Sequence, residues 1–211
     1  MIIIDCKQRS PEWFSVKAGV PSAGSCDQIV TENGEPSKSR QGYMDKLADE
    51  AIRGHVEEGY KSRPMEAGTE RETESRIVFE LDYSVQVQQV GFIFDDSRTA
   101  GCSPDGIFDG GILENFNGKK CGLELKNPLG KTHVKYLREN KLPTGVGYIQ
   151  QIQMCLLVTG FEGWMFRSYC PGHKSFDFLV PRDEKFISKL KAELEVFCLE
   201  LAKLIKKLKG G

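Results

Sequence analysis

Short runs of alternating apolar and polar residues predict the strands of this chain. In residues 83–96, apolar side chains recur at almost every second position, and they are Val85, Val87, Val90, Phe92 and Phe94. Residues 122–128 predict a second strand that ends at a proline, and residues 163–170 and 175–181 predict a later pair around the turn sequence PGHK. Each strand is expected to bury one face, because side chains at every second position share a face.

Apolar residues that recur every three or four positions predict the helices. These helices cover about residues 40–53, 65–81, 148–159 and 182–209, and the last is long and amphipathic. Two shorter helices are expected within residues 10–30, where a serine precedes a proline in the first helical turn. The order of helices, strands, helix, strands and helix predicts an α/β domain around a small mixed sheet.

The composition is that of an ordinary globular chain. Its 211 residues, 39% hydrophobic and 28% charged, predict a single domain over residues 1–211 with a long C-terminal helix at about 182–209. Lysine and arginine total 29 and aspartate and glutamate 30, so the net charge is −1. This balance does not favour a nucleic-acid partner, but a local basic groove on a neutral protein remains compatible with one.

The cysteines and the N-terminal residues indicate the cellular compartment in which the protein is expected to work. Seven cysteines lie at wide spacings and none forms a C-x-x-C pair, so we expect reduced thiols, mostly buried, rather than a zinc site or a disulfide framework. The first ten residues lack the long apolar run of a signal peptide or a membrane span. We therefore expect a soluble intracellular protein with no membrane partner.

Two acidic residues and a lysine in neighbouring predicted strands form the candidate chemical site. Glu124 and Lys126 share one face of the strand at 122–128, and Leu125 points to the core. Asp105 precedes Glu124 by 19 positions, enough for two adjacent strands and a glycine-rich connection. Two carboxylates in contact repel each other unless a cation lies between them, and hard oxygen ligands suit Mg²⁺ or Mn²⁺. A nearby lysine would position water or hold a phosphate oxygen, and the carbonyl of Leu125 would add a ligand.

Each part of this constellation also has a purely structural interpretation. A Glu-x-Lys sequence on a strand is often an exposed ion pair, and Asp-Gly is a common turn. The combination is more specific than either part, because Pro104-Asp105 is followed by Glu124-Leu125-Lys126. Together these residues indicate a metal-assisted phosphodiester hydrolase.

The same residues resemble the signature of the PD-(D/E)XK nucleases. More narrowly, CSPDG and GLELKNP resemble lambda exonuclease and the related phage recombination exonucleases, the YqaJ-type viral recombinase family. The segments EWFSVKAGVPSAGSCDQIV, GTERETESRIVFE, YIQQIQMCLLVTG and RDEKFI resemble other family segments in the same order. This resemblance implies a PD-(D/E)XK nuclease-like fold, with a central mixed β-sheet flanked by helices.

The resemblance also implies roles for individual residues at the metal. Asp105 and Glu124 would bind the catalytic metal with the Leu125 carbonyl, and Lys126 would assist the nucleophilic water. Glu72, on the helix predicted at 65–81, would complete the acidic site. The implied cofactor is Mg²⁺, with Mn²⁺ as a substitute, and two ions would take part in catalysis.

A second set of residues would bind DNA and its terminal 5′-phosphate. The resemblance implies Lys17, Ser22, Ser25, Ser103, Tyr148, Gln151 and Gln153, of which Tyr148 and Gln151 share one helix face and Gln153 lies on another. Lys17 stands where lambda exonuclease carries arginine, and a lysine offers a point charge without bidentate geometry. The family serine aligns with Gly24, so Ser22 and Ser25 both remain candidates.

The function implied by the resemblance is that of a 5′→3′ exonuclease. It would digest one strand of double-stranded DNA from its end, prefer a 5′-phosphate, release mononucleotides and leave a 3′ overhang for recombination. The implied assembly is a homotrimeric ring that works with a single-strand annealing protein in the cytoplasm of a bacterial host, encoded by a phage or prophage. Two alternatives stay open: a PD-(D/E)XK endonuclease or junction resolvase, and a non-catalytic module that binds DNA ends.

Overall fold

The computed structural model describes residues 1–56, 63–113 and 118–210. Its helices are α1 (Pro11–Lys17), α2 (Arg40–Arg53), α3 (Arg63–Tyr83), α4 (Gly130–Glu139), α5 (Tyr148–Thr159) and α6 (Glu184–Leu208), with the short 3-10 helices η1 (Ala23–Gln28) and η2 (Gly110–Ile112). Its strands are β1 (Ile2–Ile4), β2 (Phe92–Phe94), β3 (Gly101–Cys102), β4 (Gly106–Asp109), β5 (Lys120–Lys126), β6 (Gly163–Ser168) and β7 (Phe176–Pro181). In the described ranges, no helix has both the length and the apolar content that crossing a bilayer requires.

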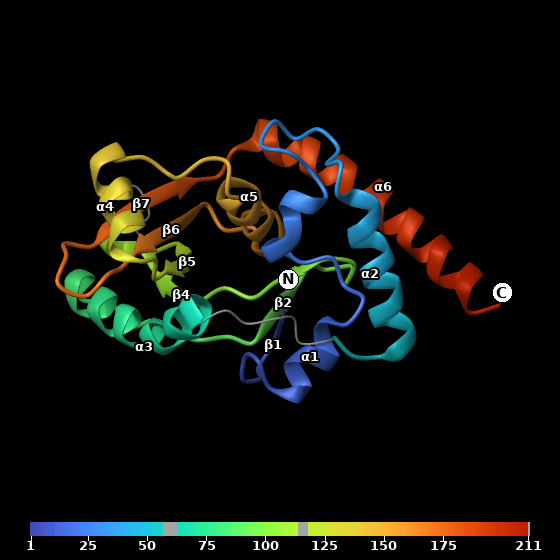
Figure 1. Cartoon of the computed structure of the whole chain (residues 1–211), viewed down its shortest axis with the longest axis horizontal. Helices are drawn as coiled ribbons and strands as arrows, with labels where there is room; N and C mark the ends of the chain where they lie inside the picture. Colours follow the sequence, from blue (N-terminus) through green and yellow to red (C-terminus); the bar gives the residue numbers. More distant parts are fainter. Residues whose placement is uncertain (57–62, 114–117, 211) are drawn as a thin grey trace.

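The strands form two sheets. One is antiparallel in the order β1-β2-β3, and the other has the order β4-β5-β6-β7. In the second sheet β5 and β6 run parallel and the other pairs antiparallel, so this sheet is mixed as predicted. The parallel pair requires a crossover, which α4 and α5 supply. Figure 1 shows α3 and α4 beside the four-stranded sheet, and α1 and α2 beside the three-stranded sheet.

Two apolar clusters hold these layers together. The larger one joins η1, α2, α5 and α6, and α5 contacts both sheets. The smaller one packs Phe79 of α3 against Phe108, Leu123 and other residues of the four-stranded sheet. Gly122 of β5 leaves room for the Trp164 side chain on the adjacent strand β6, because a Cβ atom there would lie 2.3 Å from the Trp164 ring. Since α3 packs directly on β4 and β5, the helix that bears Glu72 lies beside the strands that bear the other candidate acids.

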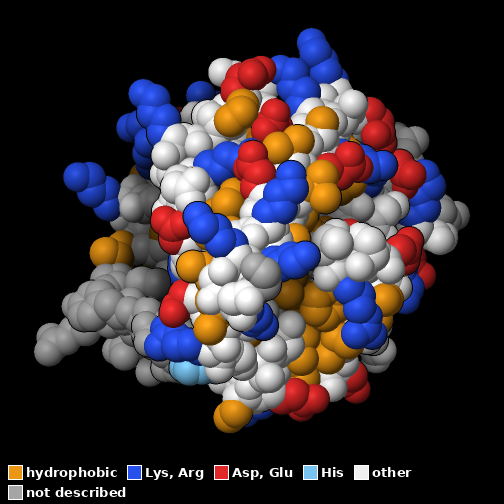
Figure 2. Space-filling view, turned by 90° about the vertical axis from the view of Figure 1, so that its right-hand side faces the viewer, with side chains coloured by type: hydrophobic (Ala, Val, Ile, Leu, Met, Phe, Trp, Pro, Cys, Tyr) orange, Lys and Arg blue, Asp and Glu red, His pale blue; other side chains and the backbone are white. Residues whose placement is uncertain are grey.

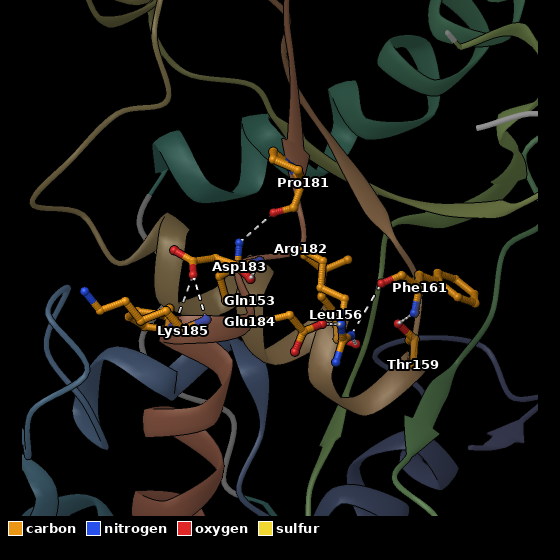
Figure 3. A network of polar contacts seen from close by, with 10 residues as sticks. Gln153, Leu156, Thr159, Phe161, Pro181, Arg182, Asp183, Glu184 and Lys185 are labelled. Atoms are coloured by element: carbon orange, nitrogen blue, oxygen red, sulfur yellow. Dashed lines mark hydrogen bonds and ion pairs between the residues drawn. The ribbon is translucent and has the colours of Figure 1, made fainter. Parts of the chain in front are cut away.

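A polar network fixes the junction between β7, α5 and α6 (Figure 3). The amide of Gln153 donates to Pro181 O at 2.9 Å and accepts from Asp183 N at 3.0 Å. Arg182 donates to Leu156 O at 2.6 Å at the carboxyl end of α5, where a cation stabilises the helix dipole. Asp183 caps α6 by accepting from the amides of Lys185 and Phe186, both at 3.0 Å.

Replacing Asp183 by alanine is expected to lower stability without changing the candidate site. Loss of the N-cap costs about 1 kcal/mol. For a protein of this size, that corresponds to a fall of about 2–4 °C in melting temperature. Thermal unfolding followed by circular dichroism measures this effect, and Asp183→Asn, which can keep the cap, serves as the matched control. An equal fall in both variants would contradict the capping role.

Most of the predicted elements are confirmed. The helices expected at about 40–53 and 148–159 have these bounds in the structure, and the long C-terminal helix spans Glu184–Leu208. All seven cysteines are free, and five of them are buried. The strand expected at 83–96 is wrong over most of its length, because only Phe92–Phe94 form one. Val85 and Val87 are partly buried against the smaller cluster, but the strand-type pairing of residues 84–90 is limited to the isolated bridge of Gln88 with Ile107.

Candidate active site

Strands β4 and β5 bring Asp105, Glu124 and Lys126 together. Gly106 pairs with Leu123, and the amide of Asp105 donates to Leu123 O at 3.1 Å, so Asp105 lies immediately before β4 and beside β5. A carboxylate oxygen of Asp105 accepts from Leu125 N at 2.6 Å. The ammonium of Lys126 lies 2.5 Å from Glu124 Oε1, on the strand face that the alternation predicts. The opposite side chain, Leu125, is buried in the smaller cluster.

The main chain of β5 adds an oxygen to this site. In a strand, the N–H and C=O groups of alternate residues point to the same neighbour. Leu123 O and Leu125 N both bond to Asp105, so the carbonyl of Leu125 points toward the same edge, next to the Asp105 carboxylate. Two carboxylates and one main-chain carbonyl therefore converge where β4 begins.

Burial and a neighbouring acid disfavour the negative charge of Asp105. Burial raises the pKa of Asp105 well above its ordinary value, and the neighbouring Glu124 raises it further, while Lys126 opposes both. Glu124 is only 3% exposed, and a charge buried to this extent needs a partner. Lys126 supplies one positive charge for two carboxylates. A cation bound between them would relieve the remaining repulsion.

Lys126 carries its proton in this arrangement. Burial alone lowers the pKa of Lys126, but the attraction of Glu124 and Asp105 outweighs it, and the net shift is upward. The ammonium also lies 5.1 Å from the ring centre of Tyr148, within the range of a cation–π contact. Lys126 thus acts on its surroundings as a fixed positive charge and a hydrogen-bond donor.

The donor set fits a small divalent cation. Mg²⁺ is commonly held by one or two protein carboxylates, while water and substrate phosphate complete its octahedron. Asp105, Glu124 and the Leu125 carbonyl offer such a partial shell. In the part of the chain that the structure describes, no three side chains of His, Cys, Asp or Glu lie close enough to form a complete metal cluster.

Glu72 lies near the two acids but has a partner of its own. Its carboxylate is 3.7 Å from the guanidinium of Arg9, and its charge contributes to raising the pKa of Asp105. Glu72 and Asp105 line a common cleft of about 910 Å³. The structure therefore brings Glu72 to the rim of the site, where it is available to a ligand that also contacts Asp105.

Sequence reasoning missed the opposite wall of this cleft. The cleft is also lined by residues 5–10, by Arg76, one turn after Glu72 on α3, and by Gln89. Arg9 adopts a left-handed backbone conformation with φ of 64°, which is uncommon for a residue with a side chain. The sequence offers one signal, a run of polar residues before the serine that caps α1, which we interpreted only as the helix cap.

The predicted phosphate pocket is partly assembled around Trp13. The indole N–H of Trp13 lies 2.9 Å from Ser103 Oγ and 3.0 Å from Gly91 O. The ammonium of Lys17 lies 4.1 Å from the centre of the same indole. Burial lowers the pKa of Lys17, and Glu50 opposes this shift. A partly desolvated ammonium of this kind would gain stability from a bound anion.

The two candidate serines lie next to this pocket. Ser22 forms a bridge with Gly101, two residues before Ser103. The hydroxyl of the buried Tyr43 accepts from Ser22 N at 3.1 Å and also bonds to the side chains of Ser22 and Ser25. Both serines are half-buried, so the structure leaves the choice between them open.

The predicted residues of α5 separate into two groups. Tyr148 lies beside Lys126 and hydrogen-bonds Tyr136, and Gln151 is half-buried one turn later. Gln153 does not join them: it is 1% exposed, and both ends of its amide bond to the β7–α6 junction. The expected DNA contact of Gln153 is replaced by a structural one, because a residue two positions along a helix from Gln151 faces another side.

Comparisons with known proteins place this arrangement among exonucleases. The model of one protein family, described as the YqaJ-like viral recombinase domain, matches residues 12–162, more than half of the chain. The crystal structure of the alkaline exonuclease LHK-Exo from Laribacter hongkongensis superposes with a TM-score of 0.80 at 27% identity over 95% of this chain and 96% of that one. The crystal structure of LHK-Exo in complex with dAMP superposes with a TM-score of 0.81 at 28% identity, over the same shares of both chains.

A more distant structure shares the fold. A phage-related exonuclease from Haemophilus somnus 129PT superposes with a TM-score of 0.68 at 11% identity, over 90% of this chain and 96% of that one. The search of curated protein sequences gave no match. The similarity to these exonuclease structures covers 90–95% of this chain.

Proposed function

Since the chain belongs to the YqaJ-like viral recombinase family, we propose that it is a Mg²⁺-dependent 5′→3′ exonuclease. It digests one strand of double-stranded DNA from the end, releases mononucleotides and leaves a 3′ overhang for recombination. Similarity to LHK-Exo at 27% identity over 95% of the chain supports a deoxyribonuclease as the enzyme class. The complex of that exonuclease with dAMP is consistent with release of mononucleotides.

One observation carries the proposal: Asp105, Glu124 and Lys126 meet where β4 begins, with the Leu125 carbonyl at the same edge. The two carboxylates and the carbonyl would hold Mg²⁺, or Mn²⁺ in its place, and two ions take part during catalysis. A bound ion would neutralise charge on the scissile phosphate and lower the pKa of the attacking water.

The protein's own residues supply position and charge. Asp105 and Glu124 would hold the metal ion, and phosphate oxygens would supply further ligands, so these two residues determine where the scissile phosphate would bind. Lys126 places a permanent positive charge next to that phosphate and stabilises negative charge as it develops during hydrolysis. Glu72 lines the same cleft as Asp105 and serves as the third acid.

The polarity of digestion would come from the pocket around Trp13. Lys17, Ser103 and either Ser22 or Ser25 offer a cation and hydroxyl donors for a terminal 5′-phosphate, and Gln151 contributes from α5. Because Trp13 contacts both Lys17 and Ser103, these two groups form one unit. A terminal phosphate held there would set the distance to the first phosphodiester bond at Asp105.

Replacing Lys17 by alanine is expected to narrow the rate difference between 5′-phosphorylated and 5′-hydroxyl duplex ends. The rate on the phosphorylated substrate should fall by about 10- to 150-fold and the rate on the hydroxyl end much less, because a hydrogen bond to a charged group contributes about 1.5–3 kcal/mol. Initial rates on the two substrates measure this ratio. Lys206→Ala, at an exposed position in the last turn of α6, is the matched control. A ratio equal to that of the unsubstituted protein would remove Lys17 from the pocket.

The proposal extends to the assembly. A homotrimeric ring around the duplex would let a chain of net charge −1 bind DNA, because only the basic residues lining the channel need face it. Figure 2 is consistent with this distribution, since basic and acidic side chains are interspersed on the face it shows and form no single basic field. A single-strand annealing protein would receive the 3′ overhang, in the cytoplasm of a bacterial host that carries the phage or prophage.

Incubation with covalently closed circular duplex DNA distinguishes the exonuclease from its nearest alternatives. The exonuclease digests linear duplex and leaves a covalently closed circle intact, whereas an endonuclease nicks or linearises the circle and a junction resolvase cuts branched DNA. The circle and its linearised form are incubated with Mg²⁺ or with EDTA and resolved on an agarose gel. Cutting of the closed circle would favour the endonuclease, and binding without cleavage of either form would favour the non-catalytic module.

A further inference from the structure

The N-terminal segment lines the cleft, and Gln8 ties it to the stretch of chain that carries Asp105. The side-chain amide of Gln8 donates two hydrogen bonds, to Val90 O at 2.9 Å and to Pro104 O at 2.8 Å. Gln8 is half-buried and lines the same cleft as Asp105 and Glu72. A primary amide nitrogen has two hydrogens, and both are used here.

These bonds act on the peptide group that joins Pro104 to Asp105. At one end of this group, the carbonyl of Pro104 accepts from Gln8. At the other end, the amide of Asp105 donates to Leu123 O at 3.1 Å. The peptide plane is therefore held from both sides, by β5 and by the N-terminal segment. Because that plane sets the direction of the Asp105 side chain, Gln8 helps to fix where the carboxylate lies.

A second bridge from the same segment acts one residue away. Trp13 donates to Gly91 O and to Ser103 Oγ, so Gln8 and Trp13 tie together the same two stretches, residues 90–91 and 103–104. The bridge from Trp13 ends on a residue of the predicted phosphate pocket, and that from Gln8 ends beside the metal-binding acid. The two contacts should therefore affect different properties of the enzyme.

We propose that Gln8 is a positioning residue that orients Asp105 for metal binding. The inference rests on the proposed function, since it concerns the same site. Without the two hydrogen bonds, the Pro104 carbonyl loses its donor. The peptide group between Pro104 and Asp105 then has more rotational freedom, and so does the carboxylate of Asp105. The cost appears as weaker metal binding, because groups that orient metal ligands contribute about 10–100-fold to metal affinity or activity.

The test measures Mg²⁺ binding to the protein without DNA by isothermal titration calorimetry, where weaker binding is expected for the Gln8 variants, and compares it with Mg²⁺ titrations of exonuclease activity on 5′-phosphorylated linear duplex. Gln8→Leu removes both donors, and the nearly isosteric Gln8→Glu places only oxygens opposite the two carbonyls at pH 8. Both variants are expected to raise the half-activating Mg²⁺ concentration by about 10-fold and to keep the rate ratio between phosphorylated and hydroxyl ends. Trp13→Phe, which loses only the indole N–H and keeps a ring under Lys17, is expected to reduce that ratio at an unchanged half-activating Mg²⁺ concentration.

A stability control separates positioning from general loss of structure. Asp183→Ala removes the N-cap of α6, which lies outside the cleft, and lowers the melting temperature of the protein. This variant should leave the Mg²⁺ titration unchanged. If Gln8→Leu does not fold, Gln8→Glu carries the comparison. An unshifted titration in a folded Gln8 variant overturns the inference while the unsubstituted enzyme still digests DNA. If the unsubstituted protein fails to digest linear duplex at any Mg²⁺ concentration, the proposed function itself is wrong.

Discussion

Asp105→Asn is expected to abolish hydrolysis and to leave DNA binding nearly intact. The substitution removes a negative charge from the metal shell but keeps an oxygen that can accept from Leu125 N. Loss of one preorganised electrostatic group costs about 10²–10³-fold in rate, and a metal-binding carboxylate should cost at least that much. Single-turnover cleavage in Mg²⁺ measures the rate, and a gel-shift titration in EDTA measures binding.

Asp109 provides the matched control for this substitution. It lies at the other end of β4, is exposed, and accepts from Gly111 N at 2.9 Å. Asp109→Asn should retain full activity, so a loss confined to Asp105→Asn reports on the site rather than on the strand. Substantial Mg²⁺-dependent activity in Asp105→Asn would remove Asp105 from the metal shell.

The same variant should be more stable than the unsubstituted protein when no metal is present. The pKa of Asp105 is raised in the folded state by burial and by Glu124, so the folded protein binds this proton more tightly than the unfolded chain does. Its contribution to stability is fully present below the unfolded pKa and is lost as pH rises through the folded pKa. In EDTA, the melting temperature of Asp105→Asn should exceed that of the unsubstituted protein at pH 8, and the difference should shrink toward pH 4.

Lys126→Ala is expected to reduce turnover far more than affinity. The ammonium of Lys126 remains charged beside the acids, so its removal withdraws positive charge from the phosphate as negative charge develops. The turnover rate should fall by about 10²–10³-fold, while the dissociation constant for DNA should change by less than about 3-fold, as expected for an interaction made mainly in the transition state. Single-turnover rates at saturating DNA and binding titrations separate the two quantities.

Lys120 is the corresponding control on the same strand. It is exposed at the start of β5, and its position shares the strand face of Glu124 and Lys126. Lys120→Ala should leave turnover unchanged. Equal losses of turnover and affinity in Lys126→Ala would make Lys126 a phosphate anchor instead of a group that stabilises the transition state.

Strand alternation was sufficient to predict the centre of the site. The period of two placed Glu124 and Lys126 on one face and Leu125 in the core, and the ion pair and the buried leucine confirm this. Pairing of two neighbouring strands likewise placed Asp105 beside them. These features are local or nearly local, so a short sequence pattern determines them.

Other features depend on contacts between distant parts of the chain. The alternation at residues 84–90 predicts burial correctly but not a strand, because a strand also needs a continuous main-chain partner. β1 exists by pairing with β2, some ninety residues later, and three isoleucines do not indicate that partner. The hydrogen bonds of Gln8 join residues 82 and 96 positions apart in the sequence, and those of Trp13 join residues 78 and 90 positions apart. No rule based on sequence spacing would find such contacts.

The proposed enzyme digests one strand from a 5′ end and requires a divalent metal ion. The most direct measurement uses linear duplex labelled at either the 5′-phosphate or the 3′ end of the same strand, incubated with Mg²⁺ or with EDTA. With Mg²⁺, we predict that the 5′ label appears at once as a mononucleotide, while the 3′ label stays in a shortening strand, and EDTA prevents both changes. Early release of the 3′ label, internal fragments as first products, or equal digestion in EDTA would contradict the account.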